Sequence, residues 1–137
     1  MSSANPSLDS ALQHLREVRL SILHLHKALL ESERVVYEQF HGRIQSSGEF
    51  FRLVIGHDWF SWLRPISQFI IQMDDVLKSK EPVTIDQVNG LLDEAKQMLR
   101  PAQDGTTLEK RYYRAIQRDP DIALMHANLT RLLNGQG

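Results

Sequence analysis

The sequence predicts an all-α protein, a bundle of four to five helices with a long N-terminal helix. Apolar residues recur at three- or four-residue steps along most of the chain, the period that aligns side chains on one face of an α-helix. No segment alternates apolar and polar residues at a period of two, the pattern of a half-buried strand. The 137 residues, 42% of them hydrophobic and 24% charged, suffice for one globular domain with an apolar core.

Both ends of the chain are predicted to lie outside the domain. Residues 1–7 contain Ser, Asn and Pro without apolar periodicity, a composition typical of a frayed tail. We therefore expect a disordered tail over 1–7, a single helical domain over 8–134 and a short tail over 135–137.

The first predicted helix is the spine of the fold. It runs from Leu8 to about Gln45, which corresponds to roughly 57 Å at ~1.5 Å per residue. Its apolar stripe has one weak step, at Ser32 or Glu33. The residues of the stripe are Leu8, Leu12, Leu15, Val18, Ile22, Leu25, Leu29, Val36, Phe40 and Ile44.

A chain reversal is expected after the first helix. The string Ser46-Ser47-Gly48-Glu49 favours a turn, and either serine is a suitable cap for the next element. A short helical piece follows around Glu49 to Ile55, and Gly56 then permits a bend. The second apolar stripe comprises Trp59, Trp62 or Leu63, Ile66, Phe69 or Ile70, Met73, and Val76 or Leu77.

Proline and cap residues mark how the later helices begin. Pro65 lies inside the second stripe and has no N–H to donate, so this helix either kinks there or begins with Pro65 in its first turn. Thr84 is the expected N-cap of the next helix, and a further segment begins at Thr107. Asp119-Pro120 supplies a cap and a first-turn proline for the last helix.

Six histidines make a metal site the first functional hypothesis, because histidines on facing helices hold metal ions in helical bundles. His24 and His26 lie about 160° apart around a helix and cannot bind one ion. The pair Glu38-x-x-His41 has the spacing of a di-iron ligand pair, but the sequence contains no second copy. We therefore predict no metal and no cofactor, with His26 partly buried and His24 solvated.

An aromatic cluster begins the second stripe. His57, Asp58 and Trp59 are adjacent, and with Phe51 and Trp62 they would form a polar rim over a pocket for a small apolar or haem-like ligand. The alternative is structural, with Asp58 as a helix cap and the tryptophans as core residues. Neighbouring helical residues diverge by about 100°, so His57 and Asp58 cannot orient each other as a catalytic dyad. Since nucleophile-elbow and phosphate-loop motifs are also absent, we expect a protein that is not an enzyme.

The sequence EKRYYRAIQR is a basic stretch near the C-terminal end. Helical spacing places Arg111, Arg114 and Arg118 on one face, with Lys110 beside them. Such a face is either solvated or binds an anionic partner. Residues 74–94 carry six acids and two lysines and offer a complement within the chain or between subunits.

Composition excludes several classes of protein. The chain has no cysteine, which excludes disulfides and thiolate metal sites. Its 16 Lys and Arg against 17 Asp and Glu give a net charge of −1, unlike a dedicated nucleic-acid binder. The apolar runs are far shorter than the ~20 residues of a membrane span, and the first ten residues lack an export signal. We expect a cytoplasmic protein that binds neither membranes nor a specific nucleic acid.

Several segments together resemble those of small, uncharacterised bacterial helical proteins. The resemblance implies a bacterial source and a compact helical domain, and it implies no activity. It extends from the second stripe to the last helix and is carried by HDWFSWLRP from His57 to Pro65, RYYRA from Arg111 to Ala115, Asp119-Pro120-Asp121, and His126.

The leading functional hypothesis is protein–protein interaction. The first helix is longer than its partners, and Leu20, Leu23 and Leu30 widen its apolar surface, as expected if two of its faces are covered. A homodimer through this helix, or contact with another protein, is the expected assembly. A ligand-binding bundle built around His57 is the alternative.

Overall fold

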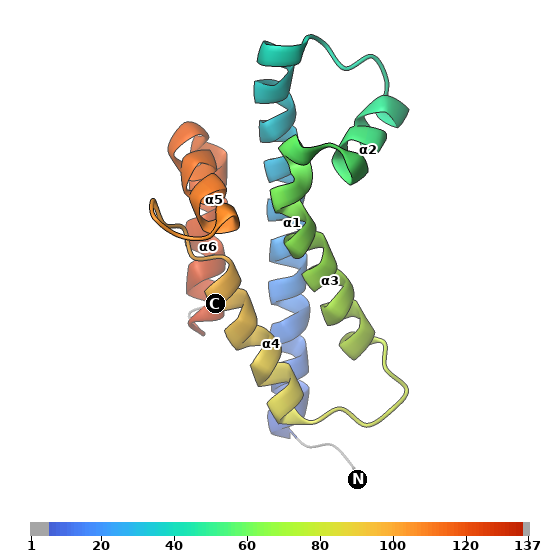
Figure 1. Ribbon diagram of the computed structural model, residues 1–137. Helices are drawn as coiled ribbons and strands as arrows, with labels where there is room; N and C mark the ends of the chain where they lie inside the picture. The colour runs from blue at the N-terminus through green and yellow to red at the C-terminus, as the bar shows by residue number, and fades with distance from the viewer. Residues whose placement is uncertain (1–5, 136–137) are drawn as a thin grey trace.

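The computed structural model describes residues 6–135 and shows an all-helical chain (Figure 1). Within that range there are six α-helices, one 3₁₀ helix and no strand, so the predicted class is confirmed. The helix count exceeds the predicted four to five, because the short piece before Gly56 is a helix of its own. The elements are α1 (Pro6–His41), α2 (Ser47–Gly56), the 3₁₀ helix η1 (Asp58–Leu63), α3 (Arg64–Leu77), α4 (Ile85–Met98), α5 (Thr107–Arg118) and α6 (Pro120–Leu133).

Helix α1 is the spine on which the other helices pack. Its 36 residues span about 54 Å, and in Figure 1 it runs the full height of the molecule. Helix α3 lies along one side of it, α5 and α6 lie along the other, and α4 crosses in front of its lower part and contacts α6. It begins at Pro6, within the predicted tail, while the remaining tail residues 1–5 and 136–137 lie outside the described part of the chain.

The predicted end of the first helix was wrong by four residues. The helix stops at His41 because Gly42 adopts a φ of +85°, a left-handed conformation that glycine tolerates best. Ile44 therefore lies beyond the helix, where its backbone N–H donates to Glu38 Oε2 at 2.8 Å and its side chain is buried. Figure 1 shows the last turns of α1 extending above α5 and α6, and Phe40 of the last turn, predicted to lie in the core, is 72% exposed.

The core forms where the apolar faces of five helices and η1 meet. Leu23 and Leu30, which had suggested a second covered face of α1, are half-buried and pack against this same core. Leu20, the third residue of that surface, is 49% exposed, so contact with a second copy through α1 stays a prediction. The core residues that are at most 1% exposed include Leu15, Val18, Ile22, Leu25, Leu29, Phe60, Ile66, Phe69, Met73, Val88, Ala95, Tyr112, Ala115, Ile122 and Leu129.

Side-chain caps begin the helices where the sequence predicted them. Ser46 accepts from the Glu49 N–H, Thr84 forms a capping box with Gln87, and Asp119 accepts from the Asp121 N–H. Pro65 lies in the first turn of α3, so this helix begins at the proline and does not kink there. Among residues 6–135, no helix combines the length and the hydrophobicity of a membrane span.

Two leucines on α1 provide a matched test of this packing. We expect Leu25→Ala to lower the free energy of unfolding by about 2–5 kcal/mol, because Leu25 is fully buried. The same substitution at Leu20, which is 49% exposed, should cost about 0.5 kcal/mol or less. Both changes alter helix propensity equally. The difference between the two losses, measured by urea unfolding followed by circular dichroism, is therefore the contribution of side-chain burial to the free energy of unfolding. Equal losses would show that α1 does not pack as described.

His26 and His24 provide a second matched pair. His26 is partly buried and His24 is exposed, as predicted, and burial lowers the pKa of the His26 imidazole below its usual value. The unfolded chain then takes up a proton near its ordinary pKa of ~6.5 while the folded chain resists it, so stability falls as the pH drops below that value.

We expect His26→Gln to reduce the loss of unfolding free energy between neutral and mildly acidic pH, and His24→Gln to leave that loss unchanged. Urea titrations of both variants at the two pH values measure this difference. The same pH dependence in His26→Gln and the wild type would contradict it.

Candidate functional site

A buried carboxylate connects α1, η1 and α5. Glu33 of α1 is 2% exposed, and all of its partners are side chains from the other two elements. Its Oε1 accepts from Arg111 at 2.6 Å and from Trp62 Nε1 at 3.0 Å, and its Oε2 accepts from Arg118 at 2.8 Å. Both oxygens are thus paired, which is what a buried charge requires. We call Ser32, Glu33, Trp62, Arg111 and Arg118 the Glu33 network.

The spacing of the two arginines explains how one carboxylate binds both. Arg111 and Arg118 are seven residues apart, about two turns of α5, and therefore lie on the same face of that helix. Arg118 also donates to Ser32 Oγ at 2.8 Å, and Arg111 donates to the Trp59 carbonyl at 3.3 Å. Two cations against one anion leave this site with a charge of +1, and the arginines stay about one-third exposed.

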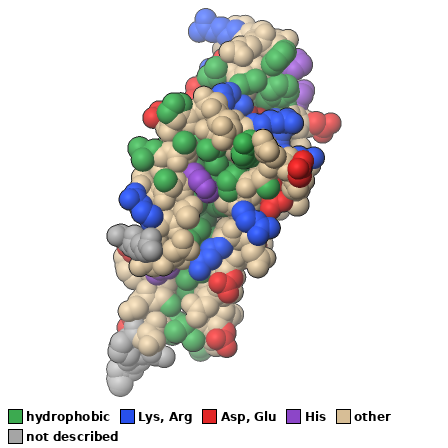
Figure 2. All heavy atoms as spheres, turned by 90° about the vertical axis from the view of Figure 1, so that its left-hand side faces the viewer, with side chains coloured by type: hydrophobic (Ala, Val, Ile, Leu, Met, Phe, Trp, Pro, Cys, Tyr) green, Lys and Arg blue, Asp and Glu red, His purple; other side chains and the backbone are tan. Residues whose placement is uncertain are grey.

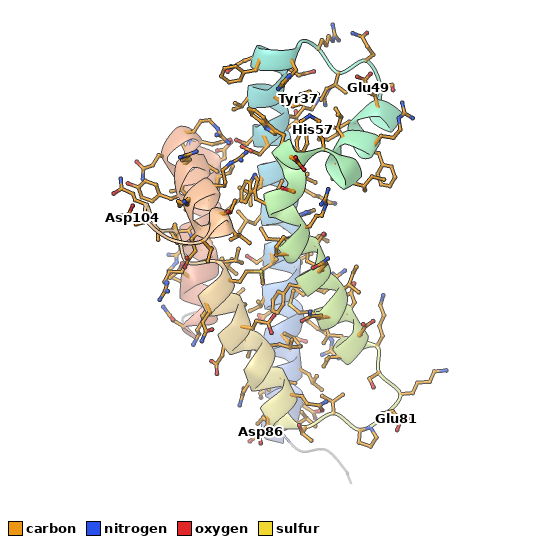
Figure 3. The ribbon with its side chains drawn as sticks, viewed as in Figure 1. Tyr37, Glu49, His57, Glu81, Asp86 and Asp104 are labelled. Carbon is orange, nitrogen blue, oxygen red and sulfur yellow. The ribbon has the colours of Figure 1, made fainter. Side chains whose placement is uncertain are left out.

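Tyr37 is the centre of an aromatic cluster above the Glu33 network. Its ring stacks on His41 at 4.5 Å between centroids and meets the edges of His57 and Trp59 at 5.5 and 5.8 Å. Figure 3 shows Tyr37 and His57 close together between α1 and η1. Trp59 Nε1 is buried, and within the described residues it has no hydrogen-bond partner. We call Tyr37, His41, His57 and Trp59 the Tyr37 cluster.

The structure brings together only some of the residues predicted to form one aromatic pocket: Arg111 lies over the rings of both Trp59 and Trp62, at 5.7 Å from each. His57 and Trp59 contact α1 within the Tyr37 cluster, whereas Trp62 points to Glu33. Phe51 is exposed on α2, and among the described residues its ring makes no aromatic contact. Asp58 is exposed, and the cap of η1 is His57, whose Nδ1 accepts from the Trp59 N–H at 3.0 Å.

The four basic residues of α5 likewise do not form one open patch. Arg111 and Arg118 turn inward to Glu33, where they are held by ion pairs. Lys110 and Arg114 are exposed, and neither makes an ion pair with another described residue. Within the chain, Arg111 and Arg118 are therefore complemented by Glu33, and Asp74 of the acidic segment 74–94 pairs with Arg19.

An uncovered apolar surface lies beside the Glu33 network. Phe40 continues the core face of α1 beyond the end of α5, and its ring lies 6.0 Å from that of Trp59. Figure 2, which views the α5 and α6 side, shows hydrophobic side chains at the surface at this end of the molecule. A groove of about 480 Å³ adjoins it, lined by Ser32, Val35, Val36, Gln39, Arg118, Asp119 and Pro120.

Metal binding finds no support in the described residues, which contain no group of three histidine, aspartate or glutamate side chains placed to hold an ion. Glu38, a candidate ligand by its spacing, accepts instead from the Ile44 N–H and lies 3.9 Å from Arg34.

Comparisons of the chain with protein-family models, curated proteins and solved structures find no match. Function is therefore inferred from the geometry of this chain.

In the sequence, the central residue of the Glu33 network appears only as a polar residue that interrupts an apolar stripe. Glu33 is the weak step in an otherwise apolar stripe, and a carboxylate at such a position requires a buried cation. Two arginines seven residues apart on one face of a later helix were the matching signal. Spacing indicates which face a side chain occupies, but it does not indicate which helix lies opposite.

We expect Glu33→Gln to lower the free energy of unfolding by about 2–3 kcal/mol. The amide cannot accept from both arginines, and its NH₂ group would face a guanidinium donor. Glu31→Gln is the matched control, because Glu31 is 63% exposed and its pair with Arg34 is long, at 3.6 Å. Urea unfolding measures both variants, and equal losses would mean that the Glu33 network does not hold α5 against α1.

Proposed function

We propose that the protein is a non-enzymatic binding protein that acts through protein–protein contact, and that its first partner is a second copy of this chain. The contact is made by Val35, Val36, Gln39, Phe40 and Pro120, which we call the Phe40 surface. The observation that supports it is the 72% exposure of Phe40 on the face of α1 that elsewhere forms the core. Large aromatic side chains at such positions are the usual anchors of protein interfaces.

The Phe40 surface offers a projection and a hollow side by side. Phe40 projects from α1, and the adjoining groove of about 480 Å³ is larger than a phenylalanine side chain. In a twofold dimer each copy contributes the same surface, so each Phe40 would fill the groove of the other copy. Burying a phenylalanine contributes about 2 kcal/mol, and the symmetry provides this contribution twice.

Charge at the groove also favours a second copy as the occupant. Arg118 and Asp119 are adjacent and both line the groove, so a cation, which is also paired with Glu33, and an anion lie side by side there. A twofold axis passing between them would set each charge against the opposite charge of the partner. A partner with a single sign of charge would meet one like charge there. We also propose that the protein works in the cytoplasm of a bacterium and binds no specific nucleic acid. The net charge of −1 and the resemblance to bacterial helical proteins support this setting.

A small apolar or haem-like ligand at the aromatic residues is the second candidate function. The supporting observation is the buried Trp59 Nε1, which has no hydrogen-bond partner among residues 6–135, since a buried donor of this kind can serve a ligand acceptor. His57 would be the polar contact of such a ligand. Extra mass on the native protein that is lost in His57→Ala would favour this function, and an apo protein would argue against it.

We expect the wild type to form a dimer, and Phe40→Glu to be a folded monomer. Phe40 is exposed, so its replacement should leave the helical circular dichroism spectrum unchanged. Native mass spectrometry and light scattering over a range of protein concentrations measure the subunit number. Ile71→Glu is the control, because Ile71 is 59% exposed on α3, away from the Phe40 surface. A monomeric wild type, or a Phe40→Glu variant that still dimerises, would overturn the proposal.

A further inference from the structure

The sequence contains two Asn-Gly pairs, and the structure places them in contrasting backbone environments. Asn89 and Gly90 lie inside α4, whereas Asn134 and Gly135 follow the last residue of α6. All four residues are exposed to solvent. An asparagine that precedes a glycine can react with its own backbone, because glycine has no side chain to shield the peptide nitrogen between them. The two pairs therefore offer the same chemistry inside a helix and beyond the end of one.

The reaction converts asparagine into an acidic residue and needs only water. The backbone nitrogen of the glycine attacks Cγ of the asparagine, and the side-chain amide leaves as ammonia together with the proton of that nitrogen. The five-membered succinimide ring that results is opened by water at one of its two carbonyls, which gives aspartate or isoaspartate. The new carboxylate is ionised at pH 7, so the chain, with its net charge of −1, gains one negative charge.

Helix α4 opposes this reaction at Asn89. Ring closure requires the peptide after the asparagine to turn toward Cγ, and the peptide between Asn89 and Gly90 has helical neighbours on both sides. Core residues also anchor it, since Val88 is fully buried and Leu91 packs against the core. Turning this peptide would break helical hydrogen bonds and displace core side chains, so it requires local unfolding of α4.

The peptide between Asn134 and Gly135 is held by far less. Asn134 has a ψ of 8°, so it has already left the helical value of about −42°. Gly135 has a φ of +76°, and its N–H donates to the Leu132 carbonyl at 3.1 Å, the one hydrogen bond of this peptide group among residues 6–135. The Asn134 N–H donates to the Thr130 carbonyl at 3.1 Å, so Asn134 itself stays attached to α6. Turning the peptide after Asn134 thus costs one hydrogen bond.

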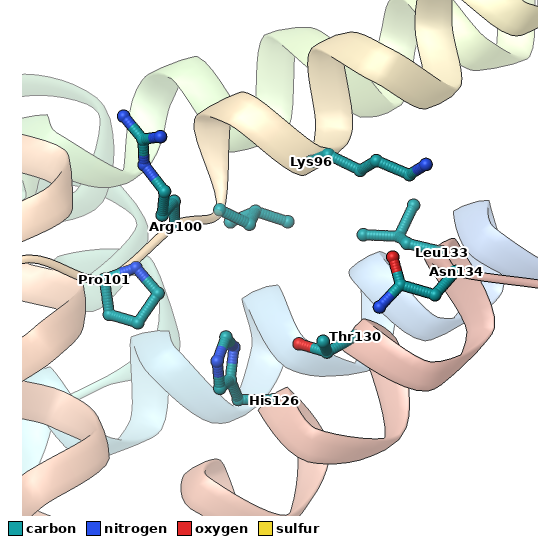
Figure 4. Close-up of a pocket in the computed structure, with 8 residues that line it drawn as sticks. Lys96, Arg100, Pro101, His126, Thr130, Leu133 and Asn134 are labelled. Carbon is teal, nitrogen blue, oxygen red and sulfur yellow. The ribbon is translucent and has the colours of Figure 1, made fainter. Parts of the chain in front are cut away.

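The surroundings of Asn134 leave room for the ring and for water. A Cβ placed on Gly135 would have no heavy atom within 4 Å apart from its chain neighbours, and the same holds at Gly90, so shielding does not distinguish the two pairs. Asn134 lines a hollow of about 250 Å³ between the ends of α4 and α6, and Figure 4 shows Lys96 at the same end of this hollow. None of the described residues that line it is acidic, so a carboxylate at position 134 would meet no like charge there.

We propose that Asn134 is a site of spontaneous deamidation in the folded protein, whereas α4 protects Asn89. As the protein ages, a second form of the chain accumulates that carries one more negative charge at the C-terminal end of α6. The negative end of the helix dipole disfavours a charge of this sign, so the modification weakens the last turn of α6. The site shares no residue with the Phe40 surface and does not depend on the oligomeric state.

The test follows both asparagines in one sample of the full chain, incubated at mildly alkaline pH. Trypsin cleaves after Lys80, Lys96 and Arg131 and so places Asn89 and Asn134 in separate peptides. Mass spectrometry measures the replacement of –NH₂ by –OH in each peptide, and a sample digested without incubation is the blank. We expect conversion at Asn134 to be at least about tenfold faster than at Asn89, because only Asn89 must wait for local unfolding.

Incubation in urea is the matched control. In the unfolded chain neither pair has a helix around it, and we expect the two rates to become similar. Gly135→Ala should slow conversion at Asn134, because the added methyl group shields the nitrogen, and Gly90→Ala should leave it unchanged.

Three results would overturn the proposal. The first is conversion of both asparagines at equal rates, or of Asn89 faster, in the folded chain. The second is the same ratio of rates in urea, which would show that the fold does not cause the difference. The third is an Asn134 that stays unmodified in the folded chain over the time in which the unfolded chain is converted.

Discussion

The carboxylate of Glu33 lies in the core and is bound by Arg111, Arg118 and Trp62, which come from α5 and η1. Apolar contacts are non-directional and would tolerate several rotations and shifts of α5 along α1. Three short hydrogen bonds to two oxygens allow few such rotations or shifts of α5, because any other arrangement would leave a buried charge unpaired. The Glu33 network therefore fixes the register between the spine and the helices that cover its upper half.

Local features of this chain were predictable from sequence because their causes are local. The stripe from Leu15 to Leu29, the caps at Thr84 and Asp119, and the start of α3 at Pro65 each depend on residues within a turn or two. The end of α1 was missed because Gly42 carries little signal in a sequence whose apolar period continues through Ile44. Phe40 was wrongly predicted to lie in the core for a related reason. Periodicity indicates which face of a helix a residue occupies, but not which element, if any, covers that face.

The candidate sites depend on distant residues, and spacing alone could not predict them. Arg118 and Glu33 are 85 positions apart, and the basic face of α5 had suggested solvent or a partner before the fold placed a carboxylate opposite it. The hollow between the ends of α4 and α6 is likewise lined by residues far apart in the chain, because a loop and all of α5 separate Lys96 from His126. Trp59 and Trp62 both lie 5.7 Å from the Arg111 guanidinium carbon, yet only Trp62 bonds to Glu33, while Trp59 contacts Tyr37.

Helix α2 is attached to the rest of the molecule less firmly than the other helices are to one another. None of its residues is fully buried. Its half-buried Phe50, Leu53 and Val54 pack against the core, and Arg64 donates to the Ile55 carbonyl. Such a helix can detach while the core stays closed, in a partial opening that costs less free energy than global unfolding. We therefore expect α2 to open as a separate unit, with backbone amides that exchange with deuterium ahead of those of the spine.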